Sequence, residues 1–230
     1  MTAPGGVRRD DASVREFQAD RPGGFPNPWN LAVFTALILL LVLALDRQVT
    51  QLFATHRGPL FEVAAWLTHL GEVPWSLGPP ALVFLVARYL LRRPGLATRA
   101  LFVFVSIAAS GLLVDVVKAL VGRARPGLWL NDGIYGFFFL RLSNVYQSFP
   151  SGHTACATAA CFALAALAPC YRRLLMVTGL LIGLTRVVVT AHYLSDVLCA
   201  AALSLLVVTL LRRLFAHRGW LFGANGVPQG

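Results

Sequence analysis

Six apolar runs divide this 230-residue chain and leave little room for anything but membrane-spanning helices. Each run is near or above the roughly 17 apolar residues that a helix needs to cross a bilayer. The chain is 57% hydrophobic and only 13% charged, well outside the range of an average soluble domain. The pattern therefore predicts an all-α bundle of six transmembrane helices. These cover about residues 29–45, 75–91, 100–121, 153–168, 174–191 and 197–214.

The segments outside these runs differ in composition. Residues 1–28 are rich in Gly, Pro, Arg and Asp and lack an apolar period, which predicts a disordered tail rather than a cleaved signal peptide. Residues 47–73 mix apolar and charged side chains at helical spacing, which predicts an amphipathic interfacial helix between the first two spans. We therefore expect one integral-membrane domain over residues 29–214 and a short C-terminal tail at 215–230.

Basic residues distinguish the two sides of the membrane. A net charge of +10 would suggest a nucleic-acid ligand in a soluble protein. Here the arginines lie mostly at the ends of apolar runs, where the positive-inside rule predicts the cytoplasmic side, so both termini are expected there and no nucleic acid is expected. Arg123, Arg125 and Arg141 lie on the other side, and we attribute this exception to function. The cytoplasmic set is Arg8, Arg9, Arg15, Arg21, Arg88, Arg92, Arg93, Arg99, Arg172, Arg173, Arg212, Arg213 and Arg218.

Three polar clusters fall together on the opposite side, and the first holds the only lysine of the chain, Lys118. Arg125 follows seven residues later, so the two cations share one face if the helix continues until Pro126 ends it. An ammonium and a guanidinium are complementary ligands for phosphoryl oxygens. The alternative is that Lys118 only snorkels to the interface. Asp115, one turn earlier, is expected to pair with Lys118.

The second cluster, Pro150 to His153, lies where a loop enters the fourth run. Ser151 suits a helix N-cap, and Gly152 permits a close approach of the backbone. The exposed amides of a helix N-terminus form a natural anion site, where His153 would meet a bound phosphate ester. A single histidine at a helix start is more often a surface residue, and its neighbours are what favour a catalytic role.

The third cluster places Arg186 near the end of the fifth run, His192 in a short turn and Asp196 at the start of the sixth. A carboxylate four residues from a histidine can accept its Nδ1 proton, which leaves Nε2 free as a nucleophile. Asp196 can also cap the last helix, and the two roles are compatible. Ionisable groups near a bilayer are costly and indicate function, so the three clusters together predict a membrane-embedded phosphoryl-transfer enzyme.

These clusters resemble the signature of the type-2 phosphatidic acid phosphatase superfamily, K-x6-R-P, P-S-G-H and S-R-x5-H-x3-D. They stand here as Lys118 to Pro126, Pro150 to His153 and Thr185 to Asp196, in order and with their internal spacing intact. One position departs from the pattern: Thr185 replaces the serine before the third-motif arginine and keeps a hydroxyl. The match covers roughly residues 115–200, and three motifs together are far more specific than any one of them.

The resemblance implies a role for each matching residue. His192 would attack phosphorus and form a phosphohistidine, Asp196 would hold its tautomer, and His153 would protonate the leaving group. Water would then release the phosphate, and no metal or other cofactor would be required. A neutral and a protonated histidine acting together predict a bell-shaped pH dependence of the rate. The phosphoryl oxygens would be bound by Lys118, Arg125, Ser151, the Gly152 amide and Arg186.

The expected substrate is a lipid phosphate, because a site at headgroup level above a helix bundle meets lipids before soluble esters. Candidates are phosphatidylglycerophosphate, phosphatidic acid, undecaprenyl diphosphate and the 1-phosphate of lipid A. The segments Gly122 to Pro126 and Tyr146 to His153 are similar to bacterial members of the superfamily, including lipid A 1-phosphatases, which implies a bacterial inner membrane. The distribution of arginines predicts that the site lies on its outer face. The aromatic residues between Gly127 and Phe149 are interpreted as an interfacial belt rather than a headgroup box.

Two alternatives remain open. A lipid phosphotransferase would use the same phosphohistidine and pass the phosphate to a second lipid, whereas a non-catalytic membrane protein would be expected to lose one of the two histidines. The vanadate-binding haloperoxidase branch of the superfamily is soluble, so the apolar runs argue against it. Four cysteines lack metal-ligand spacing and are assigned neither to disulfides nor to a metal: Cys156, Cys161, Cys170 and Cys199.

Overall fold

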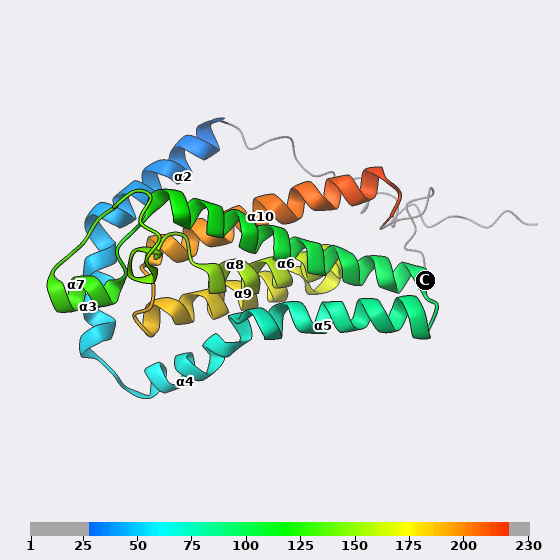
Figure 1. Ribbon diagram of the computed structural model, residues 1–230, viewed down its shortest axis with the longest axis horizontal. Helices are drawn as coiled ribbons and strands as arrows, with labels where there is room; N and C mark the ends of the chain where they lie inside the picture. Colours follow the sequence, from blue (N-terminus) through cyan, green and yellow to red (C-terminus); the bar gives the residue numbers. More distant parts are fainter. Residues whose placement is uncertain (1–27, 221–230) are drawn as a thin grey trace, which may run out of the picture.

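The computed structural model describes residues 28–220, and this part of the chain is helical, without a β-strand (Figure 1). The predicted all-α class is therefore confirmed. The predicted N-terminal tail lies outside the described residues except for Pro28. The α-helices are α2 (Pro28–Leu40), α3 (Asp46–Thr55), α4 (Pro59–Leu67), α5 (Val73–Leu85), α6 (Pro94–Val121), α7 (Pro126–Asp132), α8 (Gly152–Leu167), α9 (Arg172–Val188) and α10 (Leu194–His217). Short π or 3-10 turns are η1 (Leu41–Leu45), η2 (Thr68–Gly71), η3 (Val86–Leu90), η4 (Asn144–Tyr146) and η5 (Pro169–Tyr171).

Helix α8 lies at the centre of the bundle and packs against α6, α9 and α10, with α5 on the outside of α6. Large apolar side chains such as Phe102, Ile107 and Phe162 fill the space between α6, α8 and α10. Helix α9 approaches α8 closely because two of its contact residues are glycines. A Cβ on Gly179 would lie 2.8 Å from Cys161 Cβ, and one on Gly183 would lie 2.7 Å from Thr154 Cγ2. Small residues four apart are a typical means of close helix packing in membranes.

Within the described residues, three helices are long and apolar enough to cross a membrane. They are Trp29–Thr55, which joins α2, η1 and α3, then Pro94–Val121 and Leu194–His217. A fourth candidate is the pair Pro59–Gly71 and Val73–Leu90, bent by 41° at the break between them. Helix α8 is a shorter apolar helix. Each of the six predicted runs thus lies on a helix, while six complete crossings stay a prediction.

The segment between the first two spans differs from its predicted form. Residues 46–55 continue the first helix as α3, so this helix is ten residues longer than the predicted span. Only α4 and η2 form a separate element before α5. The location of α4 at a membrane interface stays a prediction. At the other end of the chain, α10 runs through His217 and buries Phe215, so the first residues of the predicted tail belong to the bundle.

Helix α6 ends at Val121, the end of the predicted third span, and does not continue to Pro126. Gly122 takes up a left-handed conformation with φ of 58° directly after Val121 and caps the helix. Lys118 and Arg125 therefore do not project from one continuous helix face, and Pro126 begins α7 instead of ending α6. The reason is packing: the backbone at Gly122 presses against the Phe138 carbonyl, where a Cβ would overlap with the oxygen.

Replacing Gly122 with alanine is expected to lower the free energy of unfolding by about 1–3 kcal/mol, because alanine is strained at positive φ and its methyl group meets Phe138. Thermal unfolding in detergent measures the change. Gly58→Ala is the matched control, since a Cβ at Gly58 meets no atom within 4 Å and its φ is −117°. Equal stability of the two variants would contradict the assignment of Gly122 as a required cap.

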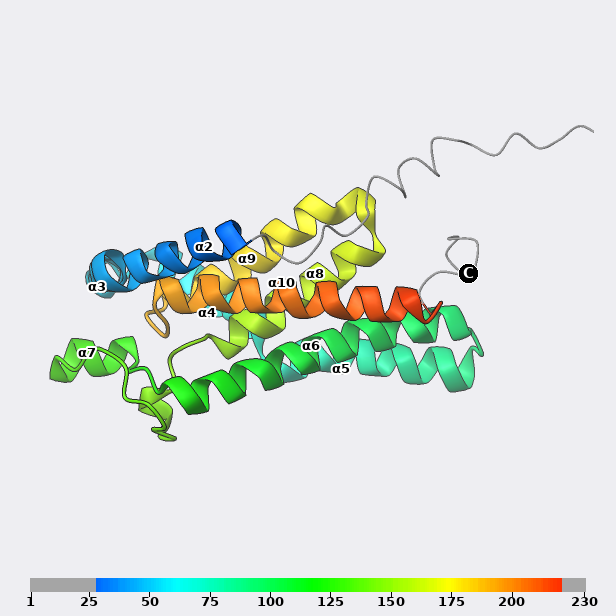
Figure 2. The ribbon, with the colours of Figure 1, turned by 90° about the horizontal axis from the view of Figure 1, so that it is seen from above.

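All three polar clusters meet at one end of the bundle. This is the end where α6 and α9 finish and α8 and α10 begin, at the left of Figure 1, with α7 beside them. Figure 1 and Figure 2 together show that the first helix crosses the bundle obliquely at this end, where it contacts the start of α10, and α3 also packs against α9. The connections between α5 and α6 and between α8 and α9 lie at the opposite end, as the alternating helix directions require.

Candidate active site

The start of α8 brings the first and second clusters together. Ser151 is the N-cap, as predicted, and its Oγ accepts hydrogen bonds from the Thr154 amide at 3.4 Å and from Thr154 Oγ1 at 2.9 Å. The Lys118 ammonium lies directly against Gly152, where a Cβ would be 2.8 Å from Nζ. The predicted pair of Lys118 with Asp115 is present at 3.4 Å, and it is weak because Asp115 is exposed. Glycine at position 152 therefore gives the lysine access to the helix N-terminus.

Two guanidinium groups near this N-terminus are held by different segments of the chain. Arg125 is held by its Nε, which donates to the Asn144 carbonyl at 2.8 Å. Arg186, in the last turn of α9, donates from Nη1 to Thr68 Oγ1 of η2 at 2.9 Å. The same turn η2 packs against the backbone of His153 through Gly71. Turn η2, which sequence reasoning did not connect with the site, therefore positions both Arg186 and His153.

The two histidines of the clusters, His153 and His192, each feel the charges of nearby cations. The charges of Lys118, Arg186 and a protonated His192 act on the His153 ring. The charges of Arg125 and Arg186 act on the His192 ring. The structure thus gathers three cations and two histidines at one helix N-terminus, an arrangement suited to a multiply charged anion such as a phosphate ester.

His192 is buried, and its ring is fixed by a main-chain group. Its Nδ1 lies 2.8 Å from the carbonyl oxygen of Ser148. A carbonyl can only accept, so Nδ1 carries the proton and Nε2 of the neutral ring carries the lone pair. Burial lowers the pKa of His192 to about 4, although the neighbouring Asp196 opposes the shift. Neutral imidazole with a free Nε2 is the nucleophilic form of histidine.

Asp196 differs from its predicted role as the direct partner of His192. Its Oδ2 is 3.6 Å from His192 Nδ1, farther than the Ser148 carbonyl. The carboxylate is already engaged: Oδ2 accepts from Ser148 Oγ at 2.6 Å and from the Tyr193 amide at 2.9 Å. The latter contact satisfies the free amide at the N-terminus of α10, which confirms the alternative capping role. Asp196 therefore acts on His192 through its charge and through Ser148.

Sequence comparison identifies the family to which these motifs belong. Residues 99–220 match the PAP2 superfamily. The chain belongs to this superfamily. The match contains all three clusters and confirms the resemblance to the type-2 phosphatidic acid phosphatases.

Individual relatives of this PAP2 protein cover most of its length. A lipid A 1-phosphatase of Rhizobium johnstonii is 30% identical over 220 residues, 90% of this chain and 89% of the relative. A lipid A 1-phosphatase of Rhizobium etli is 30% identical over 209 residues, 86% of this chain and 89% of the relative. Together with the apolar helices, these similarities identify a multi-pass membrane protein.

Two solved structures share the PAP2 fold. LpxE of Aquifex aeolicus matches with a TM-score of 0.57 and 22% identity, over 74% of this chain and 96% of that chain. A PAP2-type phosphatidylglycerolphosphate phosphatase of Bacillus subtilis matches with a TM-score of 0.57 and 23% identity, over 81% and 96%. At this level of identity the comparison establishes the helical architecture alone.

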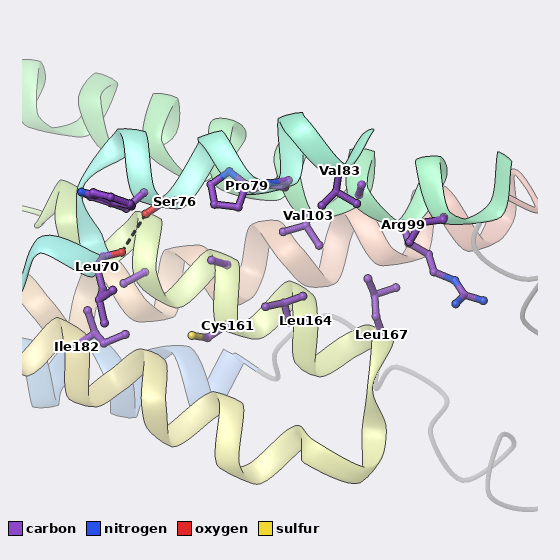
Figure 3. A pocket seen from close by; sticks show the side chains of 16 residues that line it. Leu70, Ser76, Pro79, Val83, Arg99, Val103, Cys161, Leu164, Leu167 and Ile182 are labelled. Atoms are coloured by element: carbon purple, nitrogen blue, oxygen red, sulfur yellow. Dashed lines mark hydrogen bonds between the residues drawn. The ribbon is translucent and has the colours of Figure 1, made fainter. Parts of the chain in front are cut away.

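The described residues also enclose two cavities. An apolar cavity of about 430 Å³ runs between α5, α6 and α8, with Leu70 of η2 at one end and Arg99 at the other (Figure 3). Almost all of its lining is hydrocarbon, as Val83, Val103 and Leu164 illustrate in the close-up. A second, more polar pocket of about 460 Å³ lies beside Arg125, Asp132 and Thr190. The polar pocket therefore borders the site at Arg125, and the apolar cavity reaches η2, the turn that contacts Arg186 and His153.

Sequence reasoning missed the closest partners of Asp196. Arg123 was noted only as an exception to the charge bias, yet it is fully buried and binds both Asp196 and Asp46. Aromatic rings surround its guanidinium, with Tyr193 at 4.3 Å and Phe137 at 5.2 Å. A charged residue directly after an apolar run, as Asp46 is, was the available signal.

Proposed function

We propose that this protein is an integral-membrane lipid phosphatase that removes a phosphate from a lipid phosphate or diphosphate through a phosphohistidine intermediate. One observation carries the mechanism: the Ser148 carbonyl holds the Nδ1 proton of His192, which leaves Nε2 unprotonated among the cations. Membership of the PAP2 superfamily and the lipid A 1-phosphatase relatives support a phosphatase activity.

The reaction has two steps. Nε2 of His192 attacks phosphorus, the bond from phosphorus to the leaving oxygen breaks, and His153 gives that oxygen a proton. Water then attacks the phosphohistidine, the bond from phosphorus to nitrogen breaks, and inorganic phosphate leaves while His153 accepts the proton from water. Lys118, Arg125, Arg186, Ser151 and the Gly152 amide bind the phosphoryl oxygens. These fixed cations supply the stabilisation of charge that a metal ion gives other phosphatases, so the reaction is expected to need no metal.

The lipid A 1-phosphatase relatives make the 1-phosphate of lipid A the first substrate to test. The apolar cavity supports a lipid, because it begins at η2 beside His153, the proposed donor to the leaving group, and offers hydrocarbon walls. The proposed setting is a bacterial inner membrane with both termini in the cytoplasm and the site on the outer face. It rests on the arginine-rich connections at the opposite end of the bundle.

Phosphate release by purified protein in detergent tests this function. The panel contains lipid A 1-phosphate, phosphatidic acid, phosphatidylglycerophosphate and undecaprenyl diphosphate, each with and without EDTA. We expect EDTA-resistant release, highest for lipid A 1-phosphate. Loss of all release in EDTA would contradict the metal-free reaction. A radiolabel that moves to an added acceptor lipid instead of water would identify a phosphotransferase, and no turnover by folded protein would favour a non-catalytic role.

The low pKa of His192 predicts where activity falls in acid. A histidine with its ordinary pKa of about 6.5 would lose about 90% of its neutral form at pH 5.5, whereas one with a pKa of about 4 stays neutral there. In the wild type the rate also depends on the proton of His153, so the test uses His153→Asn on an aryl phosphate, whose leaving group needs no proton. We expect kcat/KM of this variant to be nearly the same at pH 5.5 and 7, once the ionisation of the substrate phosphate is measured separately and divided out. The acid limb should lie near pH 4. A limb centred near 6.5 would show that His192 is not held neutral by burial.

A further inference from the structure

A chain of buried charges connects the His192 turn to the first helix of the protein. Asp46, Arg123 and Asp196 are each 0% exposed. Asp46 lies where the π-helical turn η1 meets α3, and π turns within helices occur frequently at functional sites. It lies outside residues 99–220, the part that matches the PAP2 superfamily. Charges buried to this degree are costly and persist where their arrangement has a use.

Arg123 lies between the two carboxylates and uses both ends of its guanidinium. Nη1 donates to Asp196 Oδ1 and to Ser195 Oγ, the latter at 2.7 Å. Nη2 donates to Asp46 Oδ2 at 2.7 Å. Burial lowers the pKa of Arg123, but Asp196 and Asp46 more than offset this and hold the pKa above its ordinary value. The guanidinium thus cannot rotate without breaking an ion pair to one of the carboxylates.

Asp46 also binds the turn that carries the nucleophile. Its Oδ1 accepts the Ser195 amide at 3.0 Å, and its Oδ2 accepts the Ser195 hydroxyl. Ser195 lies three residues after His192 and directly before Asp196. The first helix therefore holds the start of α10 through the main chain as well as through Arg123.

The other oxygen of Asp196 transmits this arrangement to the nucleophile. Oδ2 accepts from Ser148 Oγ, and the Ser148 carbonyl accepts the Nδ1 proton of His192. The Ser148 amide in turn donates to the Arg123 carbonyl at 3.0 Å. Movement of Arg123 would therefore shift both Asp196 and the carbonyl that fixes the tautomer of His192.

We propose that Asp46 is a positioning residue for the phosphatase reaction, which acts through Arg123 and Ser195 to hold His192 in its nucleophilic tautomer and orientation. This role rests on the proposed function. Asp46 lies on the first helix and is connected to His192 through these partners, so its removal should impair the chemical step and leave phosphate binding intact. A misplacement of about 1 Å by a residue remote from the chemistry can cost about 100-fold in rate.

Asp46→Asn tests this role because it keeps the size of the side chain and removes its charge. We expect kcat to fall about 100-fold, with KM and the inhibition constant of inorganic phosphate unchanged, because the phosphate ligands are untouched. Thr50→Val is the matched control: Thr50 is one turn further along α3, is buried, and its hydroxyl has no hydrogen-bond partner among the described residues. It should keep full activity. A kcat for Asp46→Asn within about twofold of wild type would overturn the role.

Two further measurements separate positioning from a general loss of folding. If Asp46 and Arg123 act in one chain, Asp46→Asn combined with Arg123→Gln should lose no more activity than Arg123→Gln alone, whereas additive losses would contradict the connection. The ring-nitrogen NMR shifts of His192 provide a readout that needs no turnover. We expect a single tautomer protonated at Nδ1 in the wild type and a mixture in Asp46→Asn. An unchanged tautomer in Asp46→Asn would overturn the positioning role, whether or not the protein releases phosphate. Absence of phosphate release from the wild type would contradict only the proposed function.

Discussion

His192→Ala is expected to abolish phosphate release, with a loss of about 10⁴-fold or more in kcat. The proposed reaction makes its new bond to Nε2 of this residue, and alanine offers no atom that can replace it. The other groups that bind phosphate stay in place, so the variant should still bind substrate. Steady-state phosphate release from lipid A 1-phosphate measures the loss, and competition by inorganic phosphate measures the retained binding.

His217→Ala is the matched control for this experiment. His217 is the last residue of α10 and lies exposed at the opposite end of the bundle from the site. It should keep wild-type activity, which separates the role of His192 from a general effect of removing a histidine. If His192→Ala released phosphate at a substantial fraction of the wild-type rate, water or another residue would have to be the nucleophile.

The second large effect is expected from His153→Asn. The loss of activity in this variant should depend on how good the leaving group of the substrate is. A general acid contributes roughly 10²–10⁴-fold when the leaving oxygen is a poor leaving group, and an alkoxide of a lipid is such a group. An aryl phosphate leaves without protonation, so the deficit of the variant should shrink strongly on that substrate. Parallel assays of wild type and His153→Asn on a lipid phosphate and an aryl phosphate measure this difference.

An equal deficit on the two substrates would assign His153 to phosphate binding instead of proton donation. Arg186→Lys is the comparison variant, because Arg186 contacts η2 as His153 does, and lysine keeps the positive charge there. It is expected to lose similar amounts on both substrates, since its loss concerns the phosphoryl oxygens that they share.

Much of the site could be predicted because its residues lie at fixed spacing beside helix ends. Ser151 was predicted as an N-cap and is one, since the hydroxyl of a serine before a helix accepts the first free amides. The two histidines and three cations were predicted to meet because alternating helices return their ends to the same side. Apolar length and charge distribution were sufficient for that inference.

The remaining features depend on contacts that no local pattern contains. The end of α6 at Gly122 follows from the approach of Phe138, sixteen residues later, whereas Lys118 and Arg125 would share one face only if the helix continued to Pro126. The partner of His192 Nδ1 is a main-chain carbonyl. Every residue has such a carbonyl, so the sequence cannot show which one accepts this hydrogen bond. Asp46 and Arg123 are 77 residues apart, and only the fold shows that they form an ion pair.

Trapping the covalent intermediate tests the central claim most directly. Wild-type protein is mixed with a lipid phosphate radiolabelled at phosphorus and quenched in alkali within a single turnover, with His192→Ala beside it. We expect label bound to the wild-type chain on the peptide that contains His192, lost when the quenched protein is acidified, and absent from the variant. Label that passes directly from lipid to inorganic phosphate, with none on the protein at any time during turnover, would contradict a phosphohistidine mechanism.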